Sequence, residues 1–131
     1  MFNRVVLVVG CILLSAHCIA ADAVAVAIPN PKDLEKAQMY LRRAAHALLN
    51  EHKPMDAKEN EAKAEALVPH ILEAKGWSEQ GWTQLRNSKL DDAFVSFKKA
   101  NAIVPCFSKF DTAQKVRDEY NNLMRAEYGL K

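Results

Sequence analysis

The sequence contains few of the residues, and none of the spacings, that most catalytic or metal-binding motifs require. Its 131 residues include only 3 cysteines and 4 glycines. It has no closely spaced cysteine pair for a metal, no glycine-rich phosphate loop and no G-x-S-x-G motif for a nucleophile. The H-E-x-x-H spacing of zinc enzymes and the C-x-x-C-H spacing of haem proteins are also missing. We therefore expect no catalytic activity, no metal site and no cofactor.

The chain also lacks a large excess of charge of either sign. It has 18 Lys and Arg residues against 16 Asp and Glu residues. A nearly neutral protein is not drawn to nucleic acid or to anionic membranes by its bulk charge, so we expect neither partner.

Long apolar runs are missing except at the N-terminus. Val5–Ala16 carries no charge and follows Arg4, and it is shorter than the roughly 20 residues of a membrane-spanning helix. Cys18-Ile19-Ala20 then supplies small residues for cleavage after Ala20. Residues 1–20 are therefore predicted to be a signal peptide, although Ala23, Ala25 or Ala27 would also serve as cleavage sites.

The protein is accordingly expected to be exported, to the periplasm or the medium, with no integral membrane span after cleavage. An uncleaved anchor and lipidation at Cys11 or Cys18 are the alternatives to cleavage. Cleavage after Ala20 leaves Cys106 as the single cysteine, so no intramolecular disulfide is possible. We expect Cys106 to be half-buried at a helix junction, the alternative being an intermolecular bridge or a reactive thiol.

A pattern of identical residues recurs at an offset of 36 residues. The segment Lys53–Pro69 returns as Lys89–Pro105, with Lys, Asp, Ala, Lys, Ala, Ala, Val and Pro at matching places. Repetition of this length is typical of stacked supersecondary units. Apolar residues recur at steps of three and four throughout residues 31–128, without strand-like alternation. The sequence thus predicts an all-α fold.

Five helices are expected after a disordered leader at residues 21–30. The first begins at Pro31 with Asn30 as its N-cap and ends near Asn50. The last begins near Ser108, which resembles a capping-box residue, and ends near Tyr128 with Gly129 behind it. The other three are predicted at residues 55–68, 69–86 and 91–104. Gly81 indicates close packing against the following helix, whereas Gly76 marks a place where the third helix could break.

The second copy of the pattern resembles a tetratricopeptide repeat. The resemblance covers residues 74–107 and rests on Trp77, Gly81, Leu90, Ala93, Phe97, Ala100 and Pro105. The first copy, residues 38–73, matches less closely through Leu41, Ala45, Ala57, Ala64 and Pro69, with Glu61 in the place of Phe97. The resemblance implies antiparallel helix-turn-helix repeats within residues 31–131 and a capping helix at residues 108–128. Two repeats are fewer than the three usually needed, which predicts an important capping helix or self-association.

The resemblance also implies a groove for a peptide on the first helix of each repeat. In the second repeat the matching positions are Lys75, Ser78, Trp82, Leu85 and Arg86. In the first repeat they are Met39, Arg42, His46, Leu49 and Asn50. Trp77 is assigned to the core, whereas Trp82 is either an anchor in the groove or packed beneath the preceding helix. The basic residues favour an acidic ligand or a C-terminal carboxylate.

These observations predict an exported, non-catalytic interaction module that binds a peptide or protein partner. A self-assembling structural protein of an envelope complex is the first alternative. A small-ligand or metal-binding helical bundle that uses the histidines is the second.

Overall fold

The computed structural model describes residues 27–129, and all regular secondary structure in this part of the chain is α-helical. The predicted signal peptide and most of the predicted leader lie outside the described residues. The all-α prediction and the number of helices are confirmed for the described part. The helices are α2 (Pro31–Leu49), α3 (Pro54–Leu67), α4 (Ile71–Arg86), α5 (Leu90–Ile103) and α6 (Ala113–Glu127).

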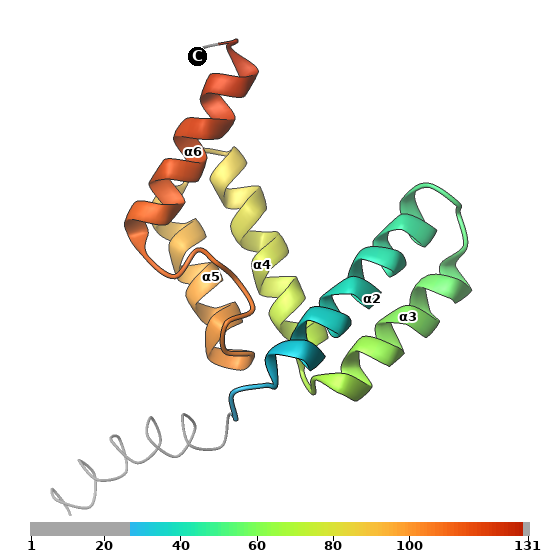
Figure 1. Cartoon of the computed structure of the whole chain (residues 1–131). Helices are drawn as coiled ribbons and strands as arrows, with labels where there is room; N and C mark the ends of the chain where they lie inside the picture. Colours follow the sequence, from blue (N-terminus) through green and yellow to red (C-terminus); the bar gives the residue numbers. More distant parts are fainter. Residues whose placement is uncertain (1–26, 130–131) are drawn as a thin grey trace, which may run out of the picture.

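The helices form two antiparallel pairs, α2 with α3 and α4 with α5, and α6 packs on the second pair (Figure 1). The pairs meet where α3 is joined to α4, and from there they diverge, so that α2 and α4 enclose an open wedge (Figure 1). None of the helices within residues 27–129 is both long and apolar enough to cross a membrane.

The backbone follows the repeat that the sequence shows. Helices α3 and α5 each have 14 residues, and both their first and their last residues are 36 positions apart. The left-handed residues recur with the same offset: His52 and Ser88 precede these helices, and His70 and Cys106 follow them. The repeat in the backbone therefore includes the turns as well as the helices, although the left-handed residues themselves differ between the two copies.

The start of α2 agrees with its prediction. The Asn30 side-chain Oδ1 accepts a hydrogen bond from the Lys32 N–H at 2.9 Å, and Pro31 occupies the first helical position. The cap satisfies one of the four N–H groups that an α-helix leaves without an internal partner.

Replacing Asn30 by alanine is expected to lower the free energy of unfolding by about 1 kcal/mol, because the capping acceptor is lost. Urea unfolding followed by circular dichroism measures this loss. Asn30→Ser is the matched control, since serine caps about as well as asparagine. A loss as large with serine as with alanine would show that the cap is not the cause.

The last helix begins later than predicted, and Ser108 is not its cap. Asn101 in α5 accepts from the Ser108 N–H at 2.7 Å and donates to the Ser108 carbonyl at 3.1 Å. These bonds use the backbone groups that a helix would need. Helix α6 therefore starts at Ala113, and the Thr112 hydroxyl accepts from the Lys115 N–H at 3.2 Å. Its end agrees with the prediction, with Gly129 in a left-handed conformation.

Two other predictions differ from the structure at the joints of the helix pairs. Helix α4 begins at Ile71 instead of Pro69, because left-handed His70 closes the turn after α3. It then continues through Gly76 without a break. Cys106 is exposed instead of half-buried, since it occupies the equivalent turn after α5.

The core consists of one main cluster and two smaller ones. The main cluster lies where the two pairs meet and contains Leu34, Ala37, Leu41, Ala64, Val68, Ile71, Ala74, Ala100 and Val104. The second lies between α6 and the second pair and contains Leu85, Ala93, Phe97, Phe110 and Val116. The third joins α2 to α3 and consists of three alanines, Ala44, Ala47 and Ala57. Because alanine buries little area, the free end of the first pair is the least stabilised part.

Candidate functional site

A hollow of about 370 Å³ lies between α2 and α4, at the base of the wedge. Three of the eight residues predicted for the groove line it together, namely Arg42, Lys75 and Ser78. The remaining lining residues are Gln38, Leu41, Ala45 and Phe107. Arg42 is exposed, while Lys75 and Ser78 are half-buried. The side chains of two consecutive helix pairs thus meet at one site.

The hollow carries mainly hydrogen-bond donors. The Lys75 ammonium forms an ion pair with Glu79 at 2.6 Å, so its charge is partly compensated. No ion pair within residues 27–129 involves Arg42. The Gln38 amide donates to the Phe107 carbonyl at 3.0 Å and thereby ties α2 to the loop after α5. A guanidinium beside a hydroxyl and an ammonium is suited to a carboxylate ligand.

Trp82 and Arg86 lie outside this hollow. They line a separate depression on α4 with Glu79 and Thr83. The Trp82 ring packs edge-on against Phe110 and Phe97, with centroid distances of 5.2 and 6.1 Å, and the Arg86 guanidinium lies 5.7 Å from its centroid. Trp82 therefore packs on the second cluster and is half-buried, while Trp77 is a half-buried neighbour of the main cluster.

Leu85 does not line a groove, contrary to the prediction. Its exposed fraction is 0%, and it shares the second cluster with Phe110 and Val116 from the region of α6. The helix that covers the second pair also covers this leucine, which the spacing of residues along α4 alone does not reveal.

His46 and Leu49 lie towards the free end of the first pair. His46 Nδ1 is 3.1 Å from a carboxylate oxygen of Glu51, whose other oxygen accepts from Lys53 at 3.1 Å. The hydrogen bond from Lys53, which has the larger effect, and the one with His46 lower the pKa of the Glu51 carboxyl below its usual value. The Leu49 side chain is largely exposed. These residues do not join Arg42 in one pocket.

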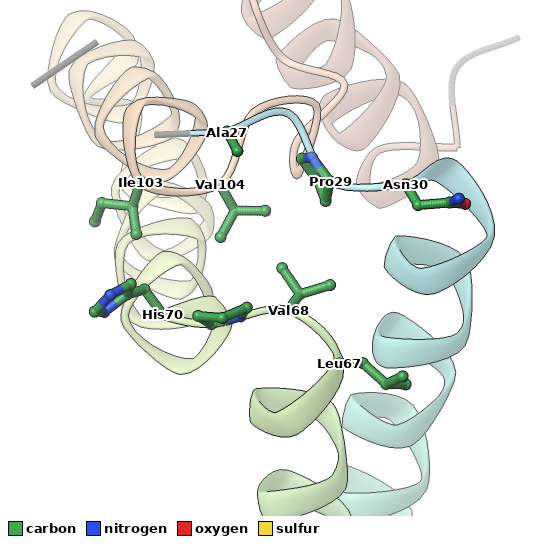
Figure 2. Close-up of a pocket in the computed structure, with 9 residues that line it drawn as sticks. Ala27, Pro29, Asn30, Leu67, Val68, His70, Ile103 and Val104 are labelled. Atoms are coloured by element: carbon green, nitrogen blue, oxygen red, sulfur yellow. The ribbon is translucent and has the colours of Figure 1, made fainter. Parts of the chain in front are cut away.

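A hollow at the junction of the two pairs was not predicted from the sequence. It measures about 460 Å³ and is lined by Ala27, Pro29, Asn30, Leu67, Val68, Pro69, His70, Ile103 and Val104. Figure 2 shows Val68 and Val104 pointing into it from the ends of α3 and α5, with the segment before α2 along one side. The repeated Val-Pro dipeptides were the available signal, because both pairs end there. Its lining is mostly aliphatic and offers few groups for specific recognition.

Within the part of the chain that the structure describes, no three His, Cys, Asp or Glu side chains gather into a metal site. Comparisons with protein-family models, with curated proteins and with solved structures find no match for this chain.

Proposed function

We propose that this protein is a non-catalytic protein-interaction module of the tetratricopeptide type, which binds a peptide or protein partner in the hollow between α2 and α4. The hollow itself is the observation that carries the proposal: the first helices of two repeated pairs present Arg42, Lys75 and Ser78 together. The matched helix boundaries of α3 and α5 support the repeat type. The apolar run in residues 1–20 supports action after export, in the periplasm or in a secreted assembly.

The ligand proposed for the hollow is an extended segment that offers a carboxylate, from an acidic side chain or from a chain terminus. Arg42 donates through a planar fork that matches a carboxylate in geometry. Ser78 and Lys75 stand on the opposite wall, and Leu41 and Phe107 provide apolar contact beside them. A partner with one acidic residue next to an apolar residue would use all of these groups.

The direct test is photo-crosslinking in the cells that make the protein. A photoreactive amino acid at position 78 would line the hollow, and the same amino acid at exposed Lys58 on α3 is the control. We expect one partner to be captured from position 78 and not from position 58. Equal products from both positions, or none from position 78, would contradict the proposal.

Once the partner is identified, Arg42→Ala and Lys75→Ala are each expected to weaken its binding. A hydrogen bond to a charged group contributes about 1.5–3 kcal/mol, which corresponds to roughly 10- to 100-fold in the dissociation constant. Lys58→Ala is the control and should leave affinity unchanged. Titration calorimetry with the purified partner measures all three, and equal affinities would exclude the hollow. Trp82→Ala is unsuitable because this ring packs against the core.

A further inference from the structure

The two helix pairs differ in whether their free ends are covered. Leu49 in α2 and Leu85 in α4 are equivalent residues of the repeat, yet their exposed fractions are 72% and 0%. Ala45 and Gly81 differ in the same way, since Ala45 is exposed and Gly81 is buried. One face of the first pair is therefore open to solvent where the same face of the second pair is covered.

The cover of the second pair comes from α6 and the segment before it. Phe110 and Val116 are buried with Leu85 and Phe97 in one cluster. The Tyr120 hydroxyl also makes a 2.8 Å hydrogen bond with Ser88 in the turn between α4 and α5. On the first pair, the main cluster includes α2 residues only up to Leu41. Beyond Leu41, the residues Arg42, Ala45 and Leu49 on this side of α2 are exposed.

The open face is defined here by Arg42, Ala45, Leu49 and Glu61. The first three follow one another along α2 at steps of three and four, which places them on one side of that helix. Glu61 in α3 takes the position of Phe97, whose ring lies 4.8 Å from that of Phe110 under the covering segment. Neither Arg42 nor Glu61 forms an ion pair within residues 27–129.

The charges of the two helices are opposite in this region. On the open face, α2 contributes the basic Arg42 and α3 the acidic Glu61, whereas Arg43, Asp56 and Glu59 line a separate depression with His46. A partner with charge of one sign would complement only one of the helices. A second copy related by a two-fold axis would complement both, because its α3 would face α2 and its α2 would face α3. The nearly neutral chain also imposes little repulsion between copies.

We propose that the open face is a dimer interface, in which the first helix pair of one copy packs on the first pair of another. Arg42 of each copy then faces Glu61 of the other, and the Leu49 side chain of each copy becomes buried in the interface. The two copies together supply four helix pairs, which exceeds the three units that repeat folds usually need. This inference goes beyond the proposed function, since it requires no other protein.

Sedimentation of the purified protein over a wide range of concentration is the first test. We expect a mass of two chains that dissociates on dilution. Leu49→Gln should raise the dissociation constant at least about 100-fold, because a two-fold symmetric interface contains the Leu49 contact twice and the variant loses both. Met55→Gln is the matched control, since Met55 is similarly exposed at 74% but lies on another side of its helix from Glu61. It should dimerise like the parent.

Mixing charge variants tests the two-fold arrangement. Arg42→Glu alone and Glu61→Arg alone each create like-charged contacts and should remain monomeric. An equal mixture of the two should form a mixed dimer, because each unlike pair is restored across the interface.

A single-chain mass for the parent at every concentration would overturn the proposal and leave the face to another protein. Equal dimerisation of the Leu49→Gln and parent proteins would overturn it as well, as would no association in the mixture of charge variants. Open-ended growth with concentration would exclude the two-fold axis in favour of end-to-end stacking. Arg42 and Ala45 belong to the hollow as well as to the open face. The protein captured by crosslinking from position 78 therefore separates the two proposals: a different protein supports the hollow, and a second copy of this chain supports the dimer.

Discussion

Replacing Phe97 by alanine is expected to remove about 3–5 kcal/mol from the free energy of unfolding, which is the usual cost of deleting a buried aromatic ring. Phe97 is the largest fully buried side chain of the described residues, with an exposed fraction of 0%. The centroid of its ring lies 4.8 Å from that of Phe110 and 6.1 Å from that of Trp82. The substitution would therefore leave a cavity between α5 and the segment that leads to α6.

The loss should be large relative to the whole stability, which is about 5–15 kcal/mol for an ordinary domain. Urea unfolding followed by circular dichroism measures it. Tryptophan fluorescence gives a second signal, to which Trp82 at the same cluster and Trp77 at the main cluster both contribute. Val95→Ala is the control, because Val95 lies on the same helix with an exposed fraction of 49%. Its effect should stay within about 0.5 kcal/mol, as for most surface positions. Similar losses for the two variants would mean that Phe97 is not buried between α4 and the segment that contains Phe110.

Phe97 also accounts for the inequality of the two helix pairs. Its equivalent in the first pair is Glu61, and the buried apolar residues near the free end of that pair are alanines. The Phe97 ring provides an aromatic surface on which Phe110 of the covering segment packs. The Glu61 carboxylate and the methyl groups of the three buried alanines provide no such surface in the first pair. The presence of Glu61 at the position of Phe97 thus weakens the first pair and also leaves it with a charged, open face.

The repeat was the part of the fold that sequence could predict best. Helices α3 and α5 depend on local chemistry, namely a lysine before the helix and a Val-Pro pair after it, and both copies carry it. Identical local residues produce identical boundaries, even though the surroundings of the two pairs differ. The Asn30 cap was predictable for the same reason, because its hydrogen bond reaches only to Lys32.

The errors occurred where a distant contact decided the local structure. Ser108 has the side chain of a helix cap, but Asn101 holds its backbone groups in a loop. Leu85 belongs to the helix that was assigned to a groove, but Phe110 and Val116 cover it. Neither contact follows from residue spacing within one helix.

The groove prediction had a similar limit. Arg42, Lys75 and Ser78 lie together because they are near the junction of the pairs, where α2 and α4 are still close. Farther along, the helices diverge, so His46 and Arg86 line different depressions. The angle between the pairs depends on side-chain packing at the junction, and the sequence pattern gives no value for it.

Gly81 and Gly76 are expected to respond in opposite directions to alanine. Both lie in α4, so each substitution gains roughly 1 kcal/mol from helix propensity. A Cβ atom at position 81 would lie 2.8–2.9 Å from three ring atoms of Phe97, whereas a Cβ atom at position 76 would have no neighbour within 4 Å. Gly76→Ala should therefore stabilise the protein. The difference between the two variants isolates the steric cost at position 81, which should be about 1–3 kcal/mol.

Phe97 cannot easily yield to the added methyl group, because its ring is held between Trp82 and Phe110. A smaller residue at position 97 should relieve the clash, so Gly81→Ala combined with Phe97→Leu should cost less than the sum of the two single substitutions. Unfolding of all four proteins in urea gives this coupling energy. Strict additivity would mean that Gly81 is not in contact with Phe97. A coupling of at least about 0.5 kcal/mol, the range found for residues in contact, would instead identify this glycine as the point of closest approach between α4 and α5.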